Sequence, residues 1–113
     1  MIVTIMCVSV MPEKQHEFEQ TVVALRDSFQ NEKDCLHYDV FKQVEGMPQY
    51  SLIGSWRKRD AADRHFSSGD FSVLSGAVKN LCDPPEIRLR IADVLKDGDN
   101  PEGIPGIVNR LID

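Results

Sequence analysis

Apolar residues recur along this chain at two spacings, one typical of strands and the other typical of helices. Residues 2–10 are largely β-branched and apolar at both alternating sets of positions, which predicts a central strand covered on two sides. From about 13 to 31 the apolar residues recur at steps of three and four, which predicts an amphipathic helix. Its predicted buried face carries Phe18, Val22, Leu25 and Phe29.

Alternation returns in two segments, 35–43 and 49–57, and the turn residues 45–48 between them predict a hairpin. A short helix is predicted from Asp60, as its N-cap, through Phe66. Residues 67–69 interrupt it, and Asp70 is the predicted cap of a further helical piece that ends before the Pro84–Pro85 pair. Residues 86–94 alternate again, which predicts a fourth strand.

The predicted order is therefore β-α-β-β-α-β, an α+β ferredoxin-like fold with a four-stranded antiparallel sheet and helices on one face. Helices cover only one face of such a sheet, yet the first strand is apolar on both faces. Phe41 and Ile53 add to the uncovered face. An apolar surface of this size favours association, so we expect a homodimer that packs sheet against sheet.

The chain is expected to form one domain over residues 1–95, followed by an extension over 96–113. The extension begins with turn-forming residues and ends in the apolar stretch 104–112. This stretch is too apolar for a free tail, so we expect it to dock on the body of the protein or across the dimer.

Composition excludes several classes of partner. A net charge of -5 and a pI near 5.1 argue against nucleic acid, which favours a basic surface. The basic run 57–59 is followed at once by Asp60 and Asp63, which is typical of a solvated turn. No apolar run is long enough for a membrane helix, and the N-terminus lacks the basic lead of a signal peptide. The 3 cysteines are far apart, which indicates reduced thiols and a cytoplasmic location.

Trp56 and His65 are the strongest candidates for chemistry, because each carries a polar atom that needs a partner if it is buried. Trp56 ends a predicted strand and His65 lies on the following helix, which suggests a lined pocket. Trp56 either orients a ligand through its indole N–H or packs at the core edge with that N–H on a backbone carbonyl. His65 is either a general base or hydrogen-bond donor, or a packing residue bonded to a neighbouring strand.

Other polar residues give weaker indications. Tyr50 shares the strand face of Trp56, so it either reaches the same cavity or fills the sheet as a strand aromatic. His37 and Asp39 share one face and form either an orienting pair or an exposed or interface pair. The three histidines are too dispersed to predict a metal site, and Cys82 has the pattern of a buried thiol.

Four stretches together are similar to a known family. They are the strand end at 10–13 with Phe18 after it, the segment 35–40, the segment 50–56, and His65 with Phe66 and Phe71. Over about residues 2–94 the chain resembles the antibiotic biosynthesis monooxygenase domain, whose members are dimeric α/β barrels. The usual Pro-Gly-Cys lead into the second strand is replaced here by Lys33-Asp34-Cys35.

The resemblance implies a cavity between the sheet and the second helix region, and a monooxygenase that oxidises a quinol or another electron-rich aromatic small molecule without a cofactor or metal. The resemblance implies catalytic roles for His65 and Trp56. It implies that the residues that bind the substrate are Tyr50, Leu52, Phe66 and Phe71. The alternative is a non-catalytic small-molecule-binding or stress-associated dimeric barrel, which a water-filled or tightly packed pocket would favour. Haem degraders of the family carry an Asn on the first strand, where this chain has Thr4, Met6 and Val8, so haem chemistry is the weakest reading.

Overall fold

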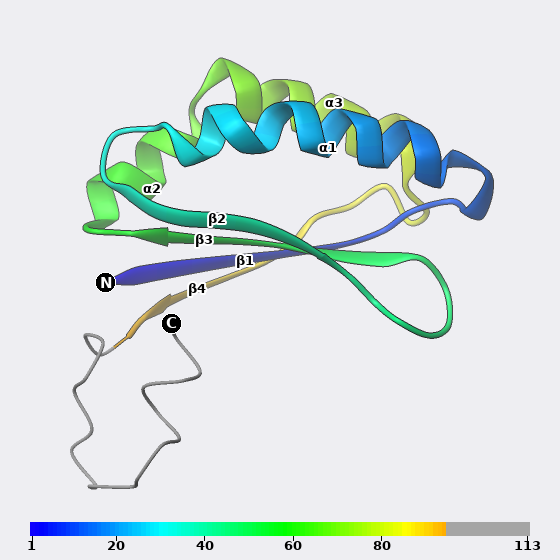
Figure 1. Cartoon of the computed structure of the whole chain (residues 1–113), viewed down its shortest axis with the longest axis horizontal. Helices are drawn as coiled ribbons and strands as arrows, with labels where there is room; N and C mark the ends of the chain where they lie inside the picture. Colours follow the sequence, from blue (N-terminus) through cyan, green and yellow to red (C-terminus); the bar gives the residue numbers. More distant parts are fainter. Residues whose placement is uncertain (95–113) are drawn as a thin grey trace, which may run out of the picture.

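Four strands and three α-helices follow one another along residues 1–94, the part of the chain that the computed structural model describes (Figure 1). In chain order they are β1 (Ile2–Ser9), a 3₁₀ turn η1 (Pro12–Lys14), α1 (Gln15–Gln30), β2 (Cys35–Lys42), β3 (Gln49–Trp56), α2 (Arg59–Phe66), α3 (Gly69–Leu81) and β4 (Arg88–Asp93). The predicted α+β ferredoxin-like order is confirmed. The predicted extension over 96–113 lies outside the described residues.

The strands form one antiparallel sheet in the order β2-β3-β1-β4. β2 and β3 form the predicted hairpin, and β1 lies in the centre with Ile5 opposite Ile53 on one side and Arg90 on the other. This register puts the even-numbered residues of β1, β2, β3 on the same face, because side chains alternate along each strand.

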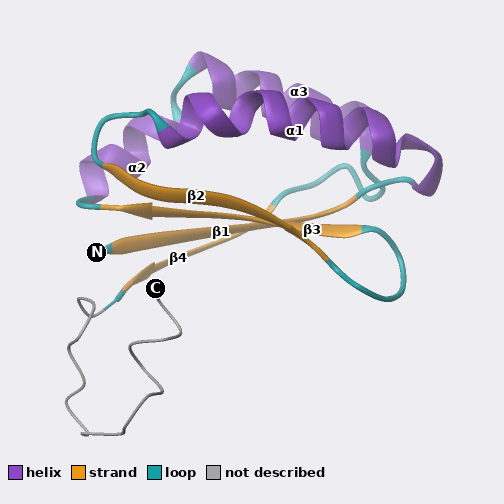
Figure 2. Cartoon of the chain, viewed as in Figure 1, coloured by secondary structure: helices purple, strands orange, loops and turns teal. Residues whose placement is uncertain are grey.

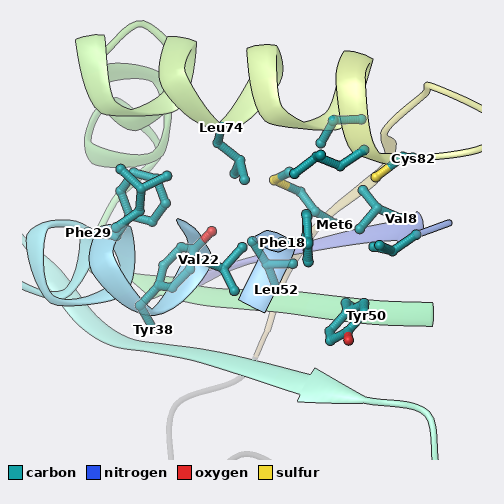
Figure 3. Close-up of a cluster of buried hydrophobic side chains, with 14 of the residues drawn as sticks. Met6, Val8, Phe18, Val22, Phe29, Tyr38, Tyr50, Leu52, Leu74 and Cys82 are labelled. Carbon is teal, nitrogen blue, oxygen red and sulfur yellow. The ribbon is translucent and has the colours of Figure 1, made fainter. Parts of the chain in front are cut away.

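Figure 2 shows the helices on one face of the sheet, and the burial of residues such as Met6, Tyr38 and Leu52 identifies it as the even-numbered face. β1 contributes Thr4, Met6 and Val8 to the core, and β3 contributes Tyr50, Leu52 and Trp56. The predicted helix face of Phe18, Val22, Leu25 and Phe29 is buried against them, which confirms the stripe. Figure 3 shows many of these side chains, among them Met6, Phe18 and Leu52, between the sheet and the helices.

Both predicted helix caps are wrong. The N-cap of α2 is Lys58, two residues before Asp60, and the N-cap of α3 is Ser68, two residues before Asp70. The Ser68 hydroxyl accepts a hydrogen bond from the Phe71 amide at 3.1 Å, which satisfies one of the free N–H groups of the first turn. The two aspartates instead lie within the first turns, where their charge favours the helix dipole.

The opposite face of the sheet has no helix over it among the described residues, so the sheet is open (Figure 1). Residues such as Ile5, Ile53 and Phe41 lie on it, with Arg88 and Arg90 along β4. The β4 strand is exposed along its whole length, including Leu89 and Ile91, which the register places on the helix side. Because residues on both faces of β4 are exposed, no helix of the described part of the chain covers this edge of the sheet.

Candidate functional site

His65 lies in the last turn of α2 and is enclosed by aromatic rings. Its side chain is 1% exposed, and its ring centroid lies 4.6–5.5 Å from those of five neighbours, namely Phe29, Tyr38, Trp56, Phe66 and Phe71. Three of the five, Trp56, Phe66 and Phe71, are residues that the sequence singled out. The structure therefore brings four of the predicted site residues together. We call His65 and its five ring neighbours the aromatic cluster.

The Trp56 indole is held by the fold. Its Nε1–H donates to the Thr4 hydroxyl at 3.0 Å, and that hydroxyl donates to the Gly54 carbonyl at 3.5 Å. A Cβ atom on Gly54 would lie 2.8 Å from Nε1, so only glycine leaves room for the indole at this position. The Trp56 N–H thus has a structural partner, and what the residue offers a ligand is the face of its ring.

The two nitrogens of His65 have different surroundings. Nδ1 lies 3.1 and 3.2 Å from the two carboxylate oxygens of Glu32, whereas Nε2 is buried with no hydrogen-bond partner among the described residues. Burial lowers the pKa of His65 below its ordinary value, and the Glu32 carboxylate acts in the opposite direction with a smaller effect. The imidazole is therefore neutral at pH 7.

An unpaired buried acceptor costs about 1–3 kcal/mol of stability, so native proteins contain few of them. Such an atom in a water-excluding ring of aromatic groups can accept a proton from a bound molecule, because nothing in the protein competes for its lone pair. The arrangement is thus chemically suited to a general base, or to a hydrogen-bond acceptor for a ligand.

Glu32 is the site residue that the sequence analysis missed. It lies on the loop between α1 and β2, 33 positions before His65, so no local spacing could have indicated the contact. It also lines a hollow of about 430 Å³, together with residues of the three helices and of the turn between α2 and α3, which include Ser28, Ala61, Arg64, Ser68 and Asp70. The Glu32 side chain therefore contacts the buried His65 and is itself partly exposed to solvent.

Tyr50 lies outside the aromatic cluster. It precedes Trp56 by six residues on β3, which corresponds to roughly 20 Å along a strand. Its ring packs on Phe18 at 5.0 Å and its hydroxyl donates to the Glu19 carboxylate. Figure 3 shows Tyr50 and the Phe29–Tyr38 pair at opposite ends of the core. Leu52 is buried two residues after Tyr50, opposite Met6 on β1.

The remaining candidates are spread over the surface and the core. Asp39 binds Arg26 at 3.3 Å, while His37 is exposed on β2, so the two form no orienting pair. Burial raises the pKa of the Cys82 thiol to about 11, which leaves it protonated and unreactive at pH 7. Within residues 1–94, no three His, Cys, Asp or Glu side chains are grouped as a metal site would need. The helices in this part of the chain are too short or too polar to cross a membrane.

Comparison with known proteins gives a family and a fold. The model of the family described as antibiotic biosynthesis monooxygenase matches residues 1–74. This range includes the whole aromatic cluster and Glu32. Curated protein sequences, by contrast, include no significant match.

Solved structures share the fold at low sequence identity. A candidate antibiotic biosynthesis monooxygenase from Nitrosomonas europaea is 18% identical, with a TM-score of 0.78 over 85% of this chain and 100% of its own. Rv0793 from Mycobacterium tuberculosis is 18% identical, with a TM-score of 0.77 over 87% of this chain and 98% of its own. A candidate monooxygenase of the same description from Deinococcus radiodurans is 16% identical, with a TM-score of 0.78 over 85% and 94%.

Proposed function

The chain belongs to the antibiotic biosynthesis monooxygenase family, and from that premise we propose that it oxidises a quinol or another electron-rich aromatic molecule with O₂ and without a cofactor. The observation that carries the proposal is the free Nε2 of His65, buried among aromatic rings and opposite a carboxylate-bound Nδ1. An aromatic substrate matches these surroundings because its ring can pack against rings while its hydroxyl meets the nitrogen.

In the proposed reaction, His65 Nε2 accepts the proton of a phenolic hydroxyl, which makes the ring a stronger electron donor. The phenolate passes one electron to O₂, and the two radicals combine into a ring-bound peroxide. The peroxide takes back the proton held by His65, its O–O bond breaks, and water leaves with the hydrogen of the ring carbon that carried the peroxide. One oxygen atom stays on that carbon as a quinone carbonyl. The substrate supplies every electron, so a phenol and O₂ give a quinone and water.

The walls of the proposed site are Trp56, Phe66 and Phe71. Phe66 and Phe71 are only partly buried and flank the joint between α2 and α3. We propose that a substrate reaches Nε2 by displacing these two rings, after which the site excludes water again. Tyr50 and Leu52 do not take part, because they lie farther along β3.

One observation favours a second candidate, a non-catalytic small-molecule-binding protein of the same fold. The space around His65 is filled by packed rings. A protein that only binds a ligand needs these rings to move apart for it and needs no catalytic group. The two candidates differ in one readout, since only the monooxygenase consumes O₂ when a quinol is added.

We further propose that the protein is a homodimer through the open sheet face and that it works in the cytoplasm. The first proposal is supported by the apolar residues on the uncovered face, and the second by the free thiols of Cys7, Cys35 and Cys82. A barrel would then arise from two open sheets, one from each copy.

Oxygen uptake with a panel of quinols tests the proposed function. We expect uptake by the wild-type protein, a loss of at least about 100-fold in His65→Ala, as for removal of a general base, and no change in His16→Ala. His16 is the matched control because it is an exposed histidine at the start of α1, outside both the aromatic cluster and the open sheet face. If His65→Ala retains wild-type uptake, His65 is not the base; if no quinol is consumed, the binding protein replaces the enzyme.

A further inference from the structure

We infer that Glu32 is a positioning residue that holds His65 in its Nδ1–H tautomer and so leaves Nε2 as the proton acceptor. The inference rests on the proposed function for the reaction that Nε2 serves. The tautomer itself is a property of the folded chain and can be measured without any substrate.

The geometry of the contact determines which nitrogen carries the proton. Both carboxylate oxygens of Glu32 face Nδ1, at 3.1 and 3.2 Å. An ionised carboxylate only accepts hydrogen bonds, and a neutral imidazole has a single N–H to give. The N–H must therefore be on Nδ1, which leaves the lone pair on the buried Nε2. Glu32 is the one hydrogen-bond partner that the described residues give to the His65 ring.

The loop that carries Glu32 is fixed at several points. The Glu32 amide donates to the Phe29 carbonyl and the Cys35 amide donates to the Glu32 carbonyl, each at 3.1 Å. Asp34, which has a positive φ of 64°, binds the segment from β3 to α2. Its carboxylate lies 3.7–3.9 Å from the side chains of Arg57, Lys58 and Arg64.

The segment from β3 to α2 also carries Trp56 and His65. The contacts of Asp34 therefore connect the loop of Glu32 to the helix of His65. The Arg57 amide adds a backbone hydrogen bond to the Asp34 carbonyl at 2.9 Å. These bonds fix the backbone that carries Glu32 relative to the segment that carries His65. A carboxylate partner controls ring orientation and tautomer, as it does for histidines in other sites.

Long-range ¹H–¹⁵N correlation spectra at pH 7.5 test the inference directly. In the wild-type protein, His65 is expected to show a protonated Nδ1 and an unprotonated Nε2, with its signals assigned by their loss in His65→Phe. In Glu32→Ala the Nε2–H form is expected to appear. Lys33→Ala is the matched control, because Lys33 neighbours Glu32 on the loop, and its spectrum is expected to match the wild type.

Steady-state oxygen uptake gives the second readout. Glu32→Ala is expected to lower kcat by about 10- to 100-fold, with little change in KM, whereas Lys33→Ala keeps the wild-type kcat. A merely structural role for Glu32 would not change the tautomer.

Three results would each overturn the inference. They are an Nε2–H or doubly protonated His65 in the wild type, an unchanged tautomer in Glu32→Ala, and an unchanged kcat in Glu32→Ala alongside an active wild type. The wild-type spectrum decides alone if Glu32→Ala does not fold. A protein that oxidises no quinol contradicts the proposed function, while the spectra still decide whether Glu32 sets the tautomer.

Discussion

At the scale of single residues, the sequence indicated Trp56, His65, Phe66 and Phe71, four of the seven residues that make up the aromatic cluster and its Glu32 partner. The order of strand end and helix suggested a pocket for Trp56 and His65, and the family resemblance added Phe66 and Phe71. Glu32 and Tyr38 reach His65 from another part of the chain, and such contacts depend on how the elements pack. Of the two alternatives for Tyr50, the structure favours the strand aromatic that packs in the core, because six residues of β3 separate it from Trp56.

Gly54 is expected to be the most sensitive glycine in the described chain. Gly54→Ala places a methyl group 2.8 Å from the Trp56 indole, which forces the ring to move and should cost about 1–3 kcal/mol in the free energy of unfolding. Urea unfolding followed by Trp fluorescence measures both the stability and the environment of the only tryptophan.

The matched control is Gly76→Ala, because a Cβ atom there meets nothing within 4 Å. Gly76 lies inside α3, where alanine is the better helix former, so this variant should gain about 0.5–1 kcal/mol. Equal effects of the two substitutions would contradict the close packing of Gly54 against Trp56.

His65 is expected to make stability depend on pH. Burial lowers its folded-state pKa, whereas the unfolded chain has the ordinary value of about 6.5. Between these two values the unfolded state binds more protons, so the contribution of His65 is present above about pH 6.5 and is lost as the pH falls through the folded-state pKa.

Urea unfolding of the wild type and of His65→Phe between pH 7.5 and 5 measures this contribution. The wild type should lose more stability than the variant over that interval, because the variant has no imidazole to protonate. Parallel losses in the two proteins would show that His65 is not kept neutral by burial.

At the scale of elements, periodicity predicted all four strands and the long helix, because each buries one face and the apolar spacing records it. Helix starts were harder to predict. Each predicted cap was an aspartate two residues inside the helix, since a carboxylate suits both the cap and the first turn. The exposure of β4 could not be predicted either, because alternation does not say which strands the helices cover.

The cap of α3 gives a test at this scale. Ser68→Ala removes the hydroxyl that accepts from the Phe71 amide and donates to the His65 carbonyl at 2.7 Å, so it should cost about 1 kcal/mol of stability. Ser72→Ala, an exposed position inside the same helix, should be neutral or slightly stabilising. Thermal unfolding of the two variants checks this, and an equally stable Ser68→Ala would contradict the assignment of the cap.

At the scale of the whole molecule, the open sheet face is the surface through which we propose that two chains associate. Its apolar residues were visible in the sequence as a first strand without a polar face, and the register confirms that Ile5 and Ile53 lie opposite each other there. A hollow of about 630 Å³ on this side is lined in part by Phe41, Arg88 and Arg90. An apolar surface with a charged margin is typical of a face that binds another protein surface.

Sedimentation equilibrium at micromolar concentration tests the proposed architecture most directly. The account predicts a species of twice the 12.8 kDa chain mass. Ile53→Glu should give the single chain, because it places a charge at the centre of the open face, while Val23→Glu on the exposed side of α1 should leave the dimer intact. A wild-type protein that sediments as a stable single chain would contradict the dimer and the barrel built from it.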